Sequence, residues 1–330
     1  MFDRKTASVP EKQPEHNSEY LLEVRDLCQS FTSGHGANKI TVKAVDHVSF
    51  NIRPAETFGL VGESGCGKTT TGRTIIRLYD PTGGQVLFDG REISGPMTNA
   101  TRKYLTDNIA MIFQDPIESL NPRMTIEEII GEGLRVRGMK DRKQVHQLVL
   151  EMLKKVGLTE EHATRYPHEF SGGQRQRIGI ARAMIIKPRM IIADEPVSAL
   201  DVSIQAQVIN LLNDLKEEMG LTILFIAHNL SVVKYFSDRI GVMYYGRMVE
   251  IARADDLYAH PLHPYTRALL SAIPEPNPLT ERTRKRTDYV PERDQDADYL
   301  AGNASMHEVE PEHFVLCSEG ELPGILDRLK

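Results

Sequence analysis

Residues 62–69 have the types and the spacing of a phosphate-binding loop, G-x-x-x-x-G-K-[ST]. The glycines allow backbone N–H groups to converge on phosphate oxygens, Lys68 supplies a point charge, and Thr69 offers a hydroxyl to Mg²⁺. The pattern therefore predicts binding of ATP or GTP, and its alternative is an ordinary glycine-rich turn. We expect nucleotide contacts from Gly62, Glu63, Ser64, Gly65, Cys66, Gly67, Lys68, Thr69 and Thr70.

The segments on either side of this loop agree with that prediction. Residues 58–61 are apolar and short enough for a buried strand, and residues 69–78 favour a helix that begins directly after the glycines. A strand, a phosphate loop and a helix in this order place the amino end of the helix at the phosphates.

A second chemical feature is the carboxylate pair Asp194-Glu195. It follows the segment 189–193, which is continuously apolar after the single charge of Arg189. Such a run is typical of a strand buried in a parallel sheet. At its end Asp194 is suited to hold Mg²⁺, usually through water, and Glu195 to accept a proton from, or orient, the water that attacks the γ-phosphate. The alternative is two solvated acids in a loop.

The segment Phe170-Ser171-Gly172-Gly173-Gln174 precedes an apolar helical stretch, 178–186. Ser171 is a good helix N-cap, and the two glycines leave the N–H groups and the positive dipole end of the helix open to an anion. On these residues alone, an ordinary capped helix explains the pattern equally well.

Together these motifs resemble the nucleotide-binding subunits of ATP-binding cassette (ABC) transporters. The family's signature Leu-Ser-Gly-Gly-Gln stands at 170–174, with Phe in place of the first Leu. Gln114 resembles the Q-loop glutamine, Asp201 the D-loop aspartate and His228 the switch histidine. Phe31 lies where the family places an aromatic ring that stacks on adenine. Taken singly, each of these side chains is more often structural, and the common order and spacing support the resemblance.

The resemblance covers residues 21 to about 250, and it implies an ATPase that uses Mg²⁺. It also implies that the signature segment faces ATP held by a second ATPase subunit, so that each pocket is complete only when two subunits close. The expected catalytic residues are Glu195, His228 and Gln114. The expected metal-site residues are Thr69, Gln114 and Asp194. The expected additional nucleotide-binding residues are Phe31, Ser171, Gly172, Gly173, Gln174 and Asp201.

The segment from residue 253 onward indicates which group within this family the chain resembles. Residues 255–270 and the cassette segment 114–125 are similar to those of importers of oligopeptides and dipeptides, although related importers carry nickel or oligosaccharides. The implied partners are a second ATPase subunit, two transmembrane permease subunits and an extracytoplasmic solute-binding protein. The second ATPase is expected to be non-identical, although the intact motifs also permit a homodimer. This chain is expected at the cytoplasmic face of the cell membrane. Because every motif lies before residue 230, deletion of 253–330 is expected to leave the pocket residues in place and to weaken assembly or coupling. The alternative is an inert tail.

The three cysteines, Cys28, Cys66 and Cys317, are too scattered for a disulfide framework or a tetrahedral metal site. Many relatives of this type carry an iron–sulfur cluster in the tail, which needs four thiolates, so we expect no cluster in this chain. Cys66 lies among phosphate-facing amides beside Lys68, a setting that favours thiolate, and its alkylation is expected to block nucleotide. The alternative is a small packing residue.

Composition excludes several other classes of protein. No stretch approaches the roughly 18 apolar residues that cross a bilayer, and a net charge of −6 argues against a nucleic-acid partner. A ribosomal cassette ATPase would carry two cassettes, and a chromosomal one would separate its motifs by long heptad arms; neither pattern is present. A regulatory cassette without hydrolysis is the remaining alternative, but Glu195 and His228 are both intact.

The predicted architecture is α/β: a P-loop NTPase of the ABC type with a parallel-sheet core. Residues 1–19 are expected to be disordered, and 20–252 to form the nucleotide-binding domain. Within it we expect an antiparallel β subdomain near 21–52 and a helical subdomain at about 115–170 that carries the signature. Residues 253–330 form a small C-terminal extension, with a charged linker at 279–298.

Overall fold

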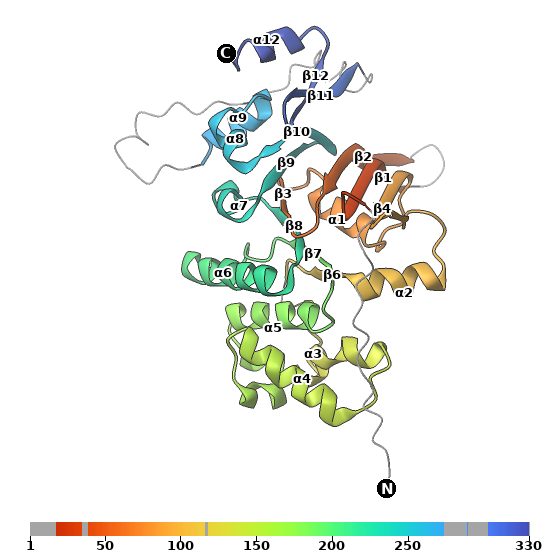
Figure 1. Ribbon diagram of the computed structural model, residues 1–330, viewed down its shortest axis with the longest axis vertical. Coiled ribbons are helices and arrows are strands. Elements are labelled where there is room, and N and C mark those ends of the chain that lie inside the picture. Colours follow the sequence, from red (N-terminus) through yellow and green to blue (C-terminus); the bar gives the residue numbers. More distant parts are fainter. Residues whose placement is uncertain (1–17, 35–38, 116–117, 274–288, 290–302, 330) are drawn as a thin grey trace.

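The computed structural model describes residues 18–34, 39–115, 118–273, 289 and 303–329. The predicted disorder at 1–19 lies almost wholly outside the described residues, as does all but one residue of the linker predicted at 279–298. The described part contains two sheets, with helices packed around them (Figure 1).

The larger sheet has the strand order β11-β12-β10-β9-β3-β8-β7-β6. Its centre is parallel, as predicted, because β3 pairs with β8 and β9, and β7 pairs with β8 and β6. The near-continuous apolar composition of these strands matches their burial on both faces. The parallel strands are β3 (Thr57–Val61), β6 (Ile109–Ile112), β7 (Met190–Asp194), β8 (Thr222–Ala227) and β9 (Arg239–Tyr244).

The smaller sheet confirms the antiparallel region predicted from the alternating segments near the start of the chain. Its order is β2-β1-β4-β5, and it shares a hydrophobic core with β3 and with helix α1 (Lys68–Ile75). The strands are β1 (Leu22–Ser33), β2 (Ile40–Ile52), β4 (Gly83–Phe88) and β5 (Arg91–Glu92).

The middle of the sequence is helical, as predicted. Here α3 (Ile126–Val136), α4 (Arg142–Lys155) and α5 (Gly172–Met184) pack together, away from the antiparallel sheet in Figure 1. Two short 3₁₀ segments, η2 (Glu160–Thr164) and η3 (Pro167–Glu169), lead into α5. The helical periodicity identified this region because its apolar residues, such as Val149 and Leu153, are fully buried.

Helix boundaries follow local capping chemistry. Helix α6 (Val202–Met219) begins after Asp201 and ends at Gly220, which has φ +62°. The helix predicted at 69–78 is shorter, because α1 ends at Ile75 and Arg77 adopts a left-handed φ of +62°. The structure also contains α2 (Asn99–Asn108) and α7 (Leu230–Phe236).

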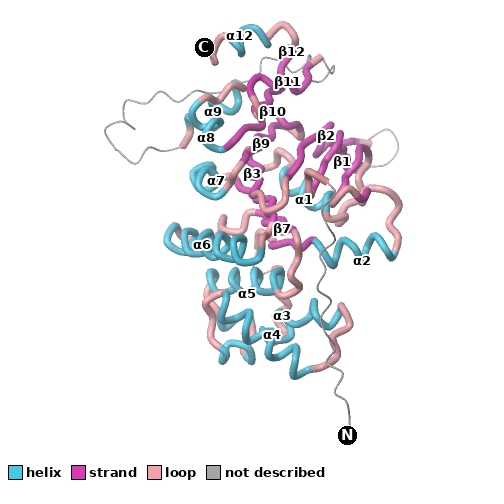
Figure 2. Tube along the Cα trace, viewed as in Figure 1, coloured by secondary structure: helices cyan, strands magenta, loops and turns pink. Residues whose placement is uncertain are grey.

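The described residues of the C-terminal extension form part of the main sheet. Strand β12 pairs antiparallel with β10, and β11 pairs with β12, so that the sheet runs on into the extension (Figure 2). Among the described residues, no helix is both long and apolar enough to cross a membrane. The elements of this end are β10 (Arg247–Arg253), α8 (Ala254–Ala259), α9 (Pro264–Ser271), β11 (Ala304–Glu310), β12 (His313–Ser318) and α12 (Leu322–Leu326).

Candidate functional site

The predicted phosphate loop connects β3 to α1, and two of its glycines are required by close backbone contacts. Gly62 and Gly67 have φ values of +150° and +108°. A Cβ at Gly62 would lie 2.2 Å from the carbonyl oxygen of Met243, and one at Gly67 would lie 2.2 Å from that of Ala44. Any side chain at either position would therefore displace backbone.

Lys68 lies inside the loop rather than in solvent. It is buried, and its Nζ donates hydrogen bonds of 2.8 Å to the carbonyl oxygens of both Gly62 and Glu63. The ammonium group is therefore held by two backbone carbonyls of the loop, beside the N–H groups that are expected to bind phosphate oxygens.

At the amino end of α1, Thr69 meets the end of β7. Its Oγ1 donates a 2.7 Å hydrogen bond to Oδ1 of Asp194, which is fully buried. Burial raises the pKa of Asp194, while the hydrogen bond from Thr69 and the charge of Arg73 oppose that rise. Oδ2 of Asp194 is buried and has no hydrogen-bond partner among the described residues. The guanidinium of Arg73 lies 3.9 Å from this oxygen. A hydroxyl and a buried carboxylate fit Mg²⁺, which prefers oxygen ligands.

The predicted catalytic side chains meet at one carboxylate. Oε2 of Glu195 accepts a 3.1 Å hydrogen bond from Nε2 of Gln114 and lies 3.0 Å from Nδ1 of His228. All three side chains line a cleft of about 830 Å³, which Arg73 and Asp115 also line. The structure thus brings together residues that are up to 114 positions apart in the sequence. From the sequence alone, only the order of the motifs indicated that these residues share a site.

The backbone of Glu195 explains how its side chain reaches this cleft. Strand β7 ends at Asp194, and Glu195 follows with a φ of +46°, an uncommon value for a residue other than glycine. The N–H of Glu195 donates to the carbonyl of Ile226 on β8, which holds the turn in place. Strain of this kind is concentrated at functional sites.

The signature segment 171–174 is not part of this cleft. Ser171 caps α5 through a 3.3 Å bond from the N–H of Gln174, whose side-chain oxygen accepts from the N–H of Ser171 in return. Gly173 is required locally, since a Cβ there would lie 2.6 Å from Ile204 on α6. Figure 1 shows α5 beside α6 and the other helices of this region, whereas α1 lies beside the antiparallel sheet. Among the described residues, no hydrogen bond or ion pair joins 171–174 to the phosphate loop.

Two further predicted residues lie outside the cluster around Glu195. Asp201 caps α6, since its Oδ1 accepts from the N–H of Ile204 at 3.0 Å and from the hydroxyl of Ser203 at 2.7 Å. Phe31 on β1 is 38% exposed and meets Tyr79 edge to face, with ring centroids 5.2 Å apart. That exposed ring area is what stacking on a base requires.

The expectation of a reactive thiolate at Cys66 is wrong. The side chain is buried, and burial raises the pKa of its thiol, while the nearby Lys68, 3.7 Å from Sγ, only partly offsets this. Desolvation disfavours the charged form more than one lysine stabilises it. The packing alternative fits this environment, because Cys66 belongs to the core shared by β3 and the antiparallel sheet.

Sequence reasoning missed Tyr265, which lies in the extension and contacts the phosphate loop. Its hydroxyl oxygen accepts a 3.0 Å hydrogen bond from the N–H of Glu63. The expectation that a deletion of 253–330 leaves the pocket residues in place did not include this contact. A buried tyrosine needs a partner for its hydroxyl, but nothing in the spacing indicates which one.

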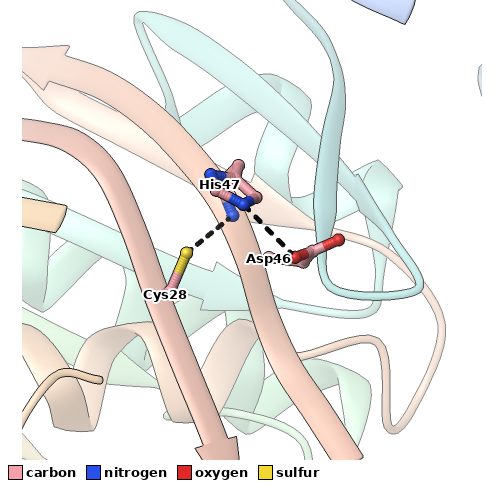
Figure 3. Close-up of side chains that lie close together, drawn as sticks. All are labelled: Cys28, Asp46 and His47. Carbon is pink, nitrogen blue, oxygen red and sulfur yellow. Dashed lines mark hydrogen bonds and ion pairs between the residues drawn. The ribbon is translucent and has the colours of Figure 1, made fainter. Parts of the chain in front are cut away.

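Cys28, Asp46 and His47 also lie close together, on β1 and β2 (Figure 3), and their ligand atoms all lie within 4.8 Å of one another. Asp46, however, already accepts a 2.8 Å hydrogen bond from Arg247 and a 3.3 Å bond from Lys43. Burial alone would raise the pKa of Asp46, but these two cations bring it below its ordinary value. Two positive charges on the carboxylate oppose a metal ion at this place.

Comparison with known families gives two matches. Residues 45–198 match the family model described as ABC transporter, and residues 249–299 match the model described as oligopeptide/dipeptide transporter, C-terminal region. An oligopeptide transport ATP-binding protein of Bacillus subtilis is 58% identical over 305 residues, which cover 92% of this chain and 98% of that protein. A dipeptide transport ATP-binding protein of Lactococcus lactis is 50% identical, with coverages of 91% and 95%.

Solved structures agree with the fold. A dimeric ATP-binding cassette in a post-hydrolysis state, bound to ADP and phosphate, is 30% identical with a TM-score of 0.64, and the match covers 71% of this chain and 98% of that one. A component of a Clostridium perfringens ABC transporter complex is 25% identical with a TM-score of 0.63, and the match covers 73% and 92%. The predicted cassette fold is confirmed.

Proposed function

Because the chain belongs to the ABC transporter ATP-binding family and carries the C-terminal region of oligopeptide and dipeptide transporters, we propose that it is the ATP-hydrolysing subunit of a peptide importer. The observation that supports hydrolysis most directly is the contact of Glu195 with both Gln114 and His228, beside the Thr69–Asp194 pair. A cassette that only bound nucleotide would have no need of this cluster.

The site residues have different roles in nucleotide binding and hydrolysis. The loop 62–70 binds the phosphates through its backbone N–H groups and Lys68, and Phe31 stacks on the adenine. Glu195 orients the attacking water and accepts its proton, while Gln114 and His228 fix the position of its carboxylate by hydrogen bonds. Ser171, Gly172, Gly173, Gln174 and Asp201 act on nucleotide held by a second ATPase subunit.

The magnesium ion of this reaction is held by Thr69, Asp194 and Gln114. When bound, it neutralises charge on the phosphate oxygens. Thr69 would offer its hydroxyl oxygen to the ion, and the buried carboxylate of Asp194 would supply negative charge beside it.

The assembly contains two ATPase subunits that close on ATP. The signature segment lies apart from the phosphate loop of the same chain. One chain therefore cannot place both segments on the same nucleotide, which supports a pocket shared by two subunits. A solved cassette of similar fold is dimeric. We infer a second, non-identical ATPase, two transmembrane permease subunits and an extracytoplasmic solute-binding protein, with this chain at the cytoplasmic face of the membrane and without nucleic acid.

The domain division proposed is 20–252 for the cassette, with its helical subdomain at about 115–170, and 253–330 for the extension. No iron–sulfur cluster is proposed in this chain, because three cysteines cannot supply four thiolates and two of them, Cys66 and Cys317, are buried. Peptides are the proposed cargo, and oligosaccharides or nickel are the alternatives.

The first experiment compares ATP binding and hydrolysis of the full chain with those of Lys68→Ala. A charge-assisted phosphate contact contributes about 1.5 to 3 kcal/mol, so the variant should bind ATP roughly 10- to 150-fold more weakly. Purification of the complex, with identification of its subunits and of the ligand of the solute-binding protein, tests the assembly and the cargo. Recovery of the chain with ribosomes, or with no membrane partner, would contradict the proposal.

A further inference from the structure

The extension reaches the nucleotide loop through one buried side chain. Tyr265 is 2% exposed, and its hydroxyl oxygen accepts the N–H of Glu63, the second residue of the loop pattern, at 3.0 Å. The two residues are 202 positions apart in the chain. A buried hydroxyl that meets a loop amide at this distance contributes to the conformation of the loop.

The ring of Tyr265 is held from two directions. Its own N–H donates a 3.1 Å bond to Nδ1 of His263, which caps helix α9. The ring packs against Tyr244 at the end of β9, with centroids 4.3 Å apart, and against Tyr289 at 5.9 Å. Because the backbone and the ring are both fixed, the hydroxyl has little freedom to leave the loop.

A buried carboxylate anchors this segment to the main sheet. Glu250 on β10 is 0% exposed, and it accepts the N–H groups of Leu262 at 2.8 Å and of His263 at 3.0 Å. It also lies 2.8 Å from Nε2 of His313 on β12. Three donors converge on one carboxylate, so the start of α9 and strand β12 are tied to the same point of the sheet.

The hairpin of β9 and β10 supports the loop from the same side. The N–H of Gly246 donates a 2.9 Å bond to the carbonyl of Cys66, and the carbonyl of Met243 lies against Gly62. With Tyr265 on Glu63, residues 62, 63 and 66 are all held by chain from beyond residue 242. Lys68 and Thr69, whose side chains serve the phosphate and the metal, follow directly.

We propose that Tyr265 is a positioning residue for nucleotide, so that the C-terminal extension is a working part of the ATP site. The inference rests on the proposed binding of ATP by the loop 62–70. A loop whose amides are already oriented loses less entropy when phosphate binds. Without the hydroxyl of Tyr265, the N–H of Glu63 can form a hydrogen bond only with water, and the loop adopts more conformations.

The test is Tyr265→Phe in the full chain, which removes one oxygen and keeps the ring packing. A neutral hydrogen bond contributes little in net terms, so the dissociation constant for a fluorescent ATP analogue with Mg²⁺ should rise about three- to tenfold. The KM for ATP of the assembled transporter should rise by the same factor. Tyr265→Leu, which also removes ring packing, should raise the dissociation constant further.

Tyr104→Phe is the matched control. Its hydroxyl donates to the carbonyl of Phe88 at 3.3 Å, away from the loop, so its loss should leave ATP affinity unchanged. A merely structural Tyr265 would lower the melting temperature in Tyr265→Phe with ATP affinity at the wild-type value, and that result overturns the inference. A fall in kcat alone also overturns it.

Lys68→Ala separates this inference from the function on which it rests. If Lys68→Ala binds the ATP analogue as tightly as the wild type, the proposed phosphate site itself fails. If Lys68→Ala loses binding while Tyr265→Phe retains the wild-type affinity, the phosphate site stands and the role of Tyr265 is overturned.

Discussion

The phosphate-loop region and the signature region differ in where their hydrogen-bond partners come from. In the loop, Thr69 bonds to Asp194 at the end of β7 and Glu63 bonds to Tyr265 in the extension. Beside the loop, Glu195 bonds to Gln114 and His228. The signature segment 171–174 instead bonds mainly to itself, through the reciprocal cap of Ser171 and Gln174.

This difference shows which half of the site a single chain can build. The loop side is joined at many points, so its geometry is fixed by the fold before any ligand arrives. The signature side is a capped helix with exposed amides at its start, which is a surface ready for an anion supplied from elsewhere. Mutations on the two sides should therefore act on different steps.

The largest effect is expected from Glu195→Gln on the loop side. The amide keeps the size of the side chain but cannot accept a proton, so turnover should fall by about a hundredfold or more. ATP binding should persist and trap a closed, ATP-loaded dimer. Steady-state hydrolysis and nucleotide occupancy of the purified complex measure both. If the variant complex still hydrolyses ATP substantially when the partner's site is also disabled, Glu195 is not the residue that accepts the proton of the attacking water.

A smaller effect is expected from Ser171→Ala on the signature side. The isolated chain should bind ATP with unchanged affinity, whereas hydrolysis by the assembled complex should fall about tenfold, since one contact to charged phosphate is lost across the interface. The loss of the cap should also destabilise α5 by about 1 kcal/mol.

Thr125→Ala is the control for that loss of a cap. Thr125 caps α3 with the same reciprocal arrangement, made with Glu128, and we assign it no nucleotide contact. Both variants should lose similar stability in urea unfolding, and only Ser171→Ala should lose hydrolysis. Equal hydrolysis by the two variants would reduce Ser171 to a helix cap and remove the basis for a shared site.

Sequence motifs predicted most of the loop side because its chemistry depends on residue type and order. Asp194 and Glu195 follow a buried strand, and Gln114 and His228 also follow strands of the parallel sheet, so parallel pairing brings them to the same edge. Strand periodicity and motif order together are enough for such a cluster.

The rest depended on tertiary packing, which leaves no pattern in the sequence. Glu250 looks like the solvent-facing residue of an alternating strand, but it is buried because the extension covers it and supplies donors. The burial of Cys66 likewise arises from neighbours distant in sequence, since it belongs to the core shared with the antiparallel sheet. The contact of Tyr265 requires the register of β9 and β10 and the position of α9, neither of which can be read from composition.

The smallest effect on nucleotide binding is expected from a pH dependence that acts on the loop side through the extension. Burial lowers the pKa of His263 to about 4, from an ordinary value of 6.5; the carboxylates of Glu250 and Glu321 oppose that shift, and Arg267 adds to it. Between pH 4 and 6.5, His263 is therefore protonated in the unfolded chain and neutral in the folded chain. Stability from this residue is complete above pH 6.5 and is lost as the pH falls toward 4, by about 2 kcal/mol at pH 5.

His263→Asn separates this titration from other acid effects, because an asparagine oxygen can still accept the N–H of Tyr265 but does not titrate. Urea unfolding should show a steeper loss of stability between pH 7.5 and 5 in the wild type than in the variant. Tyr265 lies on α9, so protonation of His263 should also weaken ATP binding. The ATP dissociation constant of the wild type, divided by that of the variant, should therefore rise as the pH falls from 7.5 to 5. Dividing the two constants removes the contribution from the titration of ATP itself. Equal pH slopes in the two proteins would show that His263 does not link protons to the phosphate loop.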